Sequence, residues 1–413
     1  MTQNELLQFS ADVGHALMIS GAEIYRVEES LRRMFLAYDE PSGEVFALPH
    51  CLIVSMSGGG EPATRMRRAA ASPVDIELLE SMNALCRRLC AETPDYGTAQ
   101  AWLVEAQSVR RRHSFWGEML GYVLGTSFFA LFFGGNAVDA LFAAVAGILI
   151  FLAQKAMRRS GGSFFIRTCV GGAIAGATAL AAAMLMPACG MEYITIGAIM
   201  TLVPGITLTN GVRDIMVGDT VSGISKLCEA LLIAAAIALG VGVALGAGLL
   251  AGVSATGDFH GAERDLPVLL KSLYAALACA GYGILYNTRG TGLFICAFGG
   301  AVATAVYTLV AAAAGDAIPA TFAAAVAVSL YAESMARLRK CPVTAYQLIA
   351  MLPLVPGGGI YYTMSAAVDG DLELAAALGV TTLGVSGMIS LGLLMVSALV
   401  GMILMRKGQV KHG

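Results

Sequence analysis

The tetrapeptide Leu202-Val203-Pro204-Gly205 recurs as Leu354-Val355-Pro356-Gly357, and the two copies are 152 residues apart. The pair Gly218-Asp219 recurs at the same offset as Gly370-Asp371. One short match would be weak in so apolar a chain, but the same offset also relates two sets of five apolar segments. The sequence therefore predicts that most of the chain is built from two copies of one module.

The composition is typical of a membrane protein. Of the 413 residues, 57% are hydrophobic and 13% are charged, and the mean hydropathy is +0.72. An average soluble domain carries about 25% charged residues, so we expect a polytopic protein in a lipid bilayer. The net charge of −3 argues against a nucleic-acid partner. The nine cysteines form no CxxC motif and no His lies at ligand spacing, so neither a metal nor a cofactor is predicted.

The chain divides near residue 114. Ten apolar segments follow, most of them with the roughly 20 residues that a membrane-spanning helix requires. They lie near 115–134, 138–156, 164–186, 191–217, 221–248, 268–286, 291–312, 317–338, 343–369 and 373–404. We therefore expect an all-α polytopic fold of ten transmembrane helices in two five-helix repeats. The repeats cover 114–250 and 268–413, with an external linker at 251–267 and a short cytoplasmic tail at the C-terminus.

Residues 1–113 are expected to form a small, soluble, cytoplasmic α+β domain. They hold 15 of the 29 acidic residues and no apolar run long enough to span a bilayer. Apolar residues at steps of three and four predict an amphipathic helix with a buried face formed by Ile24, Val27, Leu31, Met34 and Tyr38. Strands are predicted over 44–48, 52–57 and 64–69, with a glycine turn at 58–60, and helices over 74–91 and 98–113.

The basic residues predict how the chain crosses the membrane. If Arg110-Arg111-Arg112 lies in the cytoplasm, ten alternating spans leave 16 basic residues inside and only Arg264 and Lys271 outside. By the positive-inside rule, both termini are then expected on the cytoplasmic side of the inner membrane. Because five is an odd number, the second repeat must be inverted relative to the first, with Asp219 inside and Asp371 outside.

The two prolines are expected to interrupt the fourth and ninth spans near the middle of the bilayer. An interior proline removes a backbone hydrogen bond, and the freed groups must face protein or a watery cavity. Paired Pro-Gly breaks in an inverted repeat indicate a transporter's central site, although each could also mark only a kink or a turn between two half-length helices. The predicted substrate-binding residues are Pro204, Gly205, Thr207, Asn210, Arg213, Asp214, Pro356, Gly357, Tyr361 and Tyr362.

The charges within the apolar segments carry further expectations. Glu229 lies about eight residues into the fifth span, roughly 12 Å deep at 1.5 Å per residue, where a partly desolvated carboxylate could carry a proton. An ion pair with Lys226 is the alternative. The adjacent Arg213 and Asp214 fit an interfacial ion pair as well as a substrate contact. Carboxylates at span ends, where water is expected to reach them, are Glu118, Asp139 and Glu192.

No enzyme motif is present. The chain contains neither GxSxG nor HExxH, and Gly58-Gly59-Gly60 is followed by Glu61-Pro62 instead of the Gly-Lys-Ser/Thr of a phosphate-binding loop. We therefore predict that the protein is not an enzyme, and that as a transporter it would be secondary-active.

The segment from Ser20 to Glu28, Ser-Gly-Ala-Glu-Ile-Tyr-Arg-Val-Glu, resembles the N-terminal signature of the threonine/serine exporter family (ThrE type). The stretch from Leu202 to Asp219 resembles the first membrane module of that family, and the second LVPG copy resembles its second module. Two-chain relatives, the YjjP/YjjB pair linked to succinate export, carry the same modules on separate polypeptides. The resemblance covers essentially the whole chain. Within the signature, Glu23, Arg26 and Glu28 either fold the soluble domain or gate the inner mouth.

The resemblance implies a ten-span exporter that is driven by the proton-motive force and has a cytoplasmic N-terminal domain. Fusion of the modules in one chain favours threonine or serine as the exported solute, and a small dicarboxylate such as succinate is the alternative. A membrane-anchored enzyme and a channel are further alternatives, but an anchor needs no inverted repeat. The expected partners are the solute, protons and the bilayer, and a homo-oligomer is compatible with the sequence.

Overall fold

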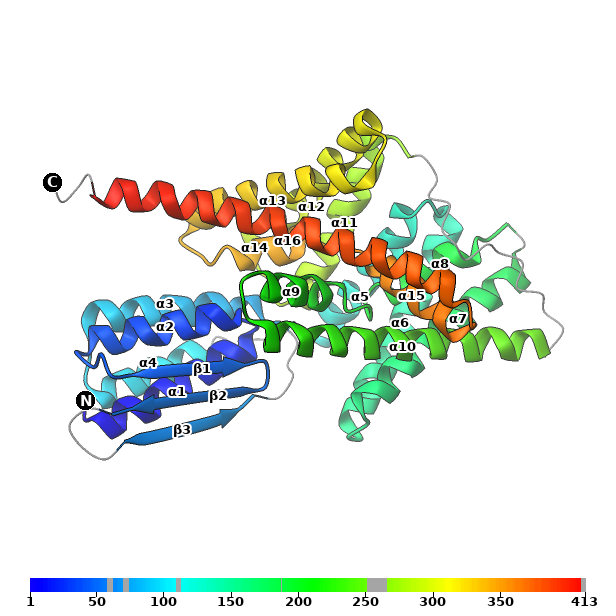
Figure 1. Cartoon of the computed structure of the whole chain (residues 1–413). Helices are drawn as coiled ribbons and strands as arrows, with labels where there is room; N and C mark the ends of the chain where they lie inside the picture. Colours follow the sequence, from blue (N-terminus) through cyan, green and yellow to red (C-terminus); the bar gives the residue numbers. More distant parts are fainter. Residues whose placement is uncertain (58–61, 70–73, 109–112, 187, 251–265, 410–413) are drawn as a thin grey trace. The chain divides into compact units, whose positions relative to one another are not determined.

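The computed structural model describes residues 1–57, 62–69, 74–108, 113–186, 188–250 and 266–409, with the backbone alone for 404–409. The glycine turn at 58–60, the arginines at 110–112, Arg264 and most of the linker predicted at 251–267 lie outside the described residues. The chain forms two compact units (Figure 1). Unit 1 comprises Met1–His113, Tyr286–Gly290 and Met335–Ala345. Unit 2 comprises Ser114–Leu285, Thr291–Ser334 and Tyr346–Gly413.

Unit 1 is a layer of helices on a three-stranded antiparallel sheet with the strand order β1-β2-β3. Helices α1 and α2 pack on the sheet, and α3 and α4 pack on α1. The register pairs Val45 with Val54 and Leu52 with Arg67, so that alternate residues of β1 and β2 face the helices. The elements are α1 (Gln3–Ser20), α2 (Ile24–Ala37), β1 (Glu44–Leu48), β2 (Cys51–Met56), β3 (Ala63–Arg68), α3 (Ile76–Glu92) and α4 (Tyr96–Ser108).

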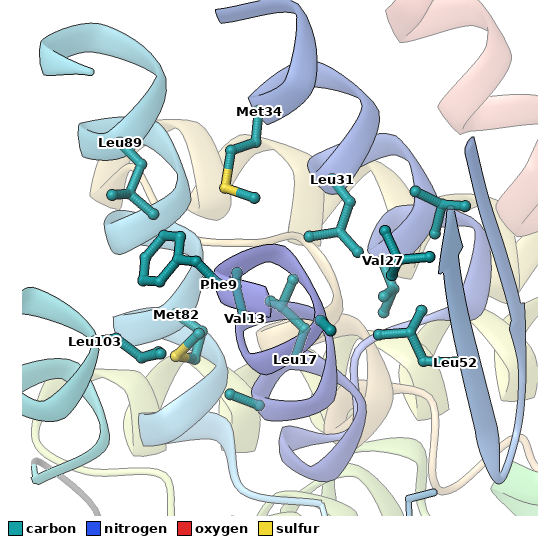
Figure 2. Close-up of a cluster of buried hydrophobic side chains, with 14 of the residues drawn as sticks. Phe9, Val13, Leu17, Val27, Leu31, Met34, Leu52, Met82, Leu89 and Leu103 are labelled. Carbon is teal, nitrogen blue, oxygen red and sulfur yellow. The ribbon is translucent and has the colours of Figure 1, made fainter. Parts of the chain in front are cut away.

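The core of unit 1 lies between these layers (Figure 2). The predicted stripe on α2 is confirmed for its first four members, whereas Tyr38 caps the end of the helix and is only partly buried. Helix α1 was not among the predicted elements, although the polar residues Asn4, Gln8, Asp12 and His15 recur along it at steps of three and four and its apolar residues are buried. The labelled core side chains are Phe9, Val13, Leu17, Val27, Leu31, Met34, Leu52, Met82, Leu89 and Leu103.

The signature segment forms the corner between α1 and α2. Gly21 ends α1 in the left-handed region at φ 92°, a conformation that favours glycine. The buried Glu23 accepts a hydrogen bond of 2.9 Å from Arg26 Nε, and Glu28 Oε1 accepts one of 2.9 Å from the backbone N–H of Ala47 in β1. These contacts lie within unit 1, so they favour the folding role over the gating role for the three charged residues.

Unit 1 also includes the loop Tyr286–Gly290. The buried Asp75 caps α3 by accepting from Leu78 N at 3.1 Å, and it accepts from Asn287 Nδ2 at 2.9 Å. The backbone N–H of Ile76 donates to Tyr286 O at 2.9 Å. A second loop is held by Arg87, which donates to Lys340 O at 2.8 Å. The two ends of α3 thus bind two chain segments that lie more than 200 residues away in the sequence.

Unit 2 is entirely helical in its described residues, and eight of its helices are long and apolar enough to cross a membrane. They are α5 (Phe115–Phe132), α6 (Ala137–Arg159), α7 (Phe164–Leu185), α10 (Thr220–Leu250), α11 (Val268–Leu285), α12 (Thr291–Ala314), α13 (Ala317–Arg339) and α16 (Leu372–Gln409). The segments expected to be the fourth and ninth spans are each a pair of short helices. These are α8 (Met191–Ile199) with α9 (Gly205–Met216), and α14 (Thr344–Ala350) with α15 (Gly357–Val368).

The order of the helices repeats along unit 2. Helices that start at residues 115, 137, 164, 191, 205 and 220 recur at 268, 291, 317, 344, 357 and 372, so each start is displaced by 152 to 154 residues. The mostly helical fold and the small N-terminal sheet agree with the sequence analysis. The ten complete spans and the inversion of the second copy stay predictions.

The two Pro-Gly breaks touch each other. Pro204 and Pro356 occupy the N-cap positions of α9 and α15, so each tetrapeptide forms a turn between two short helices. A Cβ atom added to Gly205 would overlap Val355 Cγ1 and would lie 3.6 Å from the Cα atom of Gly357. The long helix that follows each break packs on the short helices of both breaks. Helix α10 contacts α9 and α15, and α16 contacts α15 and α9.

We expect Asp75→Ala to loosen α3 and the Tyr286–Gly290 loop together. The loss of a helix cap costs about 1 kcal/mol. Asn287 Nδ2 also donates to Glu77 Oε2 at 3.2 Å, so it loses one of two hydrogen bonds, which costs about 0.5–1.5 kcal/mol more. Hydrogen exchange of the full-length protein should therefore be faster in both segments by about tenfold or more. Asp95→Ala is the matched control, because Asp95 caps the exposed start of α4 and should affect that helix alone. Unchanged exchange in the loop of Asp75→Ala would refute this coupling.

We expect Gly205→Ala to lower the thermal unfolding midpoint of the purified protein. The new methyl group overlaps Val355, and overpacking of this kind typically costs about 1–3 kcal/mol. Gly246→Ala in α10 is the control, because nothing lies within 4 Å of its added Cβ. Adding Val355→Ala to Gly205→Ala should restore part of the loss. Equal midpoints for Gly205→Ala and Gly246→Ala would show that the breaks do not need to touch.

Candidate functional site

A cavity of about 220 Å³ lies beside the second break, inside unit 2. Its wall includes the turn at 352–356 and the glycines that open α15. Three phenylalanines of α5 and its C-cap form an aromatic side, in which Phe129 and Phe132 meet edge to face at 5.8 Å. Pockets for drug-sized ligands measure about 300–1,000 Å³, so this cavity suits a smaller solute. The polar side chains in its wall are Glu192, Tyr193, Lys271, Thr304, Tyr307, Thr321 and Tyr362.

Both signs of charge line this cavity. Lys271 projects from the first turn of α11, has 8% of its surface exposed, and places its Nζ 5.1 Å from the centre of the Phe132 ring. Glu192 lies in the first turn of α8 and is partly buried. The sequence analysis counted Lys271 among the outside residues and expected Glu192 in water. The side of the membrane on which Lys271 lies stays a prediction, and Glu192 is partly buried in the cavity wall.

Two threonines add hydroxyl groups with free acceptor capacity. Thr304 Oγ1 donates to Gly300 O at 3.0 Å, and Thr321 Oγ1 donates to Ala317 O at 2.8 Å. A hydroxyl group has one proton and two lone pairs, so each of these oxygens can still accept from a solute N–H or O–H group. The polar part of the wall therefore offers acceptors of hydrogen bonds as well as charges.

The predicted residues of the second break divide between the cavity and the packed interior. Pro356 and Tyr362 line the cavity. Gly357 is buried against the first break, where its added Cβ would lie 3.1 Å from Val203 Cγ1. Tyr361 is 3% exposed and packs among apolar side chains of the first copy, with its ring centre 5.3 Å from that of Tyr362.

The predicted residues of the first break do not line this cavity. Pro204 and Gly205 are buried in the contact between the breaks, Thr207 is partly buried, and Asn210 Oδ1 is buried without a hydrogen-bond partner in the described structure. No cluster of His, Cys, Asp or Glu in the described residues could hold a metal ion. The residues predicted at the second break therefore lie partly in the cavity wall and those at the first break do not, and their roles in substrate binding stay predictions.

The charged residues after the first break form a buried network. Asp214 is 3% exposed and accepts hydrogen bonds from Lys226 Nζ at 2.6 Å and from Ser222 Oγ at 2.9 Å. Arg213 is also buried, at 7% exposure. An interfacial Arg213–Asp214 pair is therefore not what the structure contains, because Asp214 pairs with Lys226 and both residues lie in the interior.

Glu229 does not pair with Lys226 either. Lys226 forms its ion pair with Asp214. Glu229 is a partly buried residue of α10 with no ion pair among the described residues. Its part in proton coupling stays a prediction. Asp139, expected in water, is instead 1% exposed, where it accepts from Asn136 N at 2.8 Å and Gly190 N at 2.9 Å.

One sequence signal could have indicated the cavity. Lys271 lies within the sixth apolar segment, and a lysine inside such a segment is costly unless it faces protein or a polar cavity. Glu192 gave a weaker signal, because an acidic residue in the first turn of a helix is common at an exposed end. Only the tertiary packing brings these two residues to one cavity.

Comparison with known proteins identifies the family of the chain. A family model described as "Putative threonine/serine exporter" matches residues 8–247, and a second model, "Threonine/Serine exporter, ThrE", matches residues 271–399. A Mycobacterium tuberculosis protein named "Probable threonine/serine exporter" is 24% identical over 82% of this chain. A Corynebacterium glutamicum protein named "Threonine/serine exporter" is 21% identical over 93% of it.

The chain covers 66% of the length of the mycobacterial protein, slightly under two thirds, and 81% of the corynebacterial one. No solved structure matches. The two family models together account for both halves of the membrane region, and eight apolar helices run through it. The chain is therefore a multi-pass membrane protein that belongs to the threonine/serine exporter family.

Proposed function

We propose that the protein exports threonine and serine across the inner membrane as a secondary-active, proton-coupled transporter. The observation that carries the proposal is the cavity beside Pro356, where a cation, a carboxylate and hydroxyl groups line a space suited to a small solute. Hydroxy amino acids carry the matching groups. The family and the names of both relatives point to the same solutes, and neither relative is named for dicarboxylates.

Ten spans in two inverted repeats give the best account of the short helix pairs. Helices α8 and α9 have 9 and 12 residues, and at about 1.5 Å per residue their 21 residues reach ~30 Å, the thickness of the hydrocarbon core. Breaks in lipid are tolerated where they meet protein or a cavity, and here they meet each other. The shared packing of α10 and α16 is what a two-fold axis through the breaks would produce.

Threonine counterflow into proteoliposomes tests the function. Liposomes loaded with unlabelled threonine or serine should accumulate labelled threonine transiently, because an exporter exchanges solute across the membrane. Succinate loading should give no accumulation. An enzyme would show no counterflow in any of these vesicles, so a flat threonine trace with correctly reconstituted protein would reject the proposal.

The same vesicles test the coupling. An imposed pH gradient should drive net threonine movement in the wild type, and Glu229→Gln should abolish this movement while it preserves threonine exchange. The reason is that exchange returns the carrier loaded and needs no proton release. Equal gradient-driven movement in both proteins would assign Glu229 a structural role.

Cysteine labelling tests the topology. We expect single cysteines introduced at Asp219 and Asp371, in a background without the nine native cysteines, to react with an impermeant thiol reagent from opposite faces. The inverted repeat places the first residue in the cytoplasm and the second outside. Labelling of both from one face would contradict the inversion, and threonine counterflow by each variant would show that the labelled protein is folded.

A further inference from the structure

We propose that Lys271 and Glu192 recognise the two charges of a zwitterionic amino acid, with Lys271 binding the carboxylate and Glu192 the ammonium group. The inference rests on the proposed transport function and assigns the selectivity of that cavity to named residues. It follows from the presence of opposite charges in the wall of one small cavity.

Lys271 is placed to bind an anion. Only 8% of its surface is exposed, it lies in an apolar helix, and an aromatic ring lies 5.1 Å from its Nζ. A charge in such surroundings is costly to insert, and intramembrane charges of this kind usually serve a substrate or ion pathway. A carboxylate in the cavity can accept a charge-assisted hydrogen bond from this ammonium group.

The start of α15 reinforces the anionic end of the solute. Pro356 caps this helix without a side-chain hydrogen bond, and Gly358 and Gly359 in its first turn line the cavity. The first backbone N–H groups of a helix have no partner within it, and they carry the positive end of the helix dipole. Because glycine has no side chain, a carboxylate can approach this part of the backbone closely.

Glu192 supplies the opposite charge. Its side chain lines the same cavity from α8, together with the threonine hydroxyls of α12 and α13. The carboxylate and ammonium groups of an amino acid are attached to one carbon atom, so they can engage two charged side chains across a cavity of about 220 Å³. A dicarboxylate would instead place its second negative charge near Glu192, and like charges of this kind exclude a wrong solute.

Three solutes separate the two contacts. Threonine has both charges, 3-hydroxybutyrate lacks the ammonium group, and threoninol (2-amino-1,3-butanediol) lacks the carboxylate. Each is used unlabelled to compete with labelled threonine in counterflow by the full-length protein. In the wild type, we expect threonine to compete at least about tenfold better than either analogue, because each analogue loses one charge-assisted contact.

The variants should remove one preference each. Glu192→Gln should weaken threonine about tenfold or more and leave 3-hydroxybutyrate unchanged, so that the two compete alike. Lys271→Met should weaken threonine about tenfold or more and leave threoninol unchanged, so that these two solutes compete alike. Lys271→Arg should keep the preference for a carboxylate. Glu118→Gln and Lys155→Met are matched controls, because these residues form a 3.7 Å ion pair whose members do not line the cavity, and they should keep the wild-type order.

The outcomes distinguish this inference from the proposed function. If the wild type shows threonine counterflow but Glu192→Gln and Lys271→Met keep the wild-type order of the three solutes, the assignment of the two residues is wrong and transport stands. An equal loss for threonine and both analogues would also overturn it, because it would indicate a structural role. If Lys271→Met does not fold, Lys271→Arg and Glu192→Gln decide the result. Absence of threonine counterflow in the wild type would reject both proposals.

Discussion

The contact between the two Pro-Gly turns is the constraint on which unit 2 depends. Each proline prevents its segment from continuing as one helix, and the glycine that follows lets the two turns approach closely. A side chain at Gly205 would occupy the place of Val355. The two breaks therefore pack against one another, and a cavity lies beside the second turn. The long helices α10 and α16 then pack across both turns.

The two copies have the same backbone plan but different chemistry. After the first break, Asp214, Ser222 and Lys226 form a closed and buried network, so the charges there satisfy each other. Beside the second break, the wall keeps Glu192 and Lys271 in a space that a solute can fill. Part of this difference is visible in the sequence, because the residue that corresponds to Asn210 of the first copy, 152 positions later, is Tyr362. A repeat that supplies symmetric helices can thus build an asymmetric site.

Unit 1 combines a self-contained core with segments from far along the chain. The signature residues hold the α1–α2 corner and tie it to the sheet through Glu28 and Ala47. The start of α3, in contrast, binds the loop between α11 and α12 through Asp75, Ile76 and Glu77, whose carboxylate lies 3.2 Å from Arg289 Nε. Burial also raises the pKa of the Cys86 thiol to about 12, which fits its place beside the core. The contacts of the signature within unit 1 therefore favour a folding role for its charged residues.

The sequence by itself determined the class of the protein, the helical segments and the position of both breaks. Hydropathy, helical periodicity and the steric effect of proline are local properties, so they can be recognised in the sequence without knowledge of the fold. Alternating and helical apolar patterns also located most of the N-terminal elements, but α1 was missed although it carries a polar stripe from Asn4 to His15. The tertiary structure decided which charged side chains line one cavity and which form ion pairs. Lys271 and Glu192 line one cavity although they are 79 residues apart in the sequence. Asp214 forms an ion pair with Lys226 and not with its neighbour Arg213, because side-chain partners depend on how helices pack and not on sequence distance.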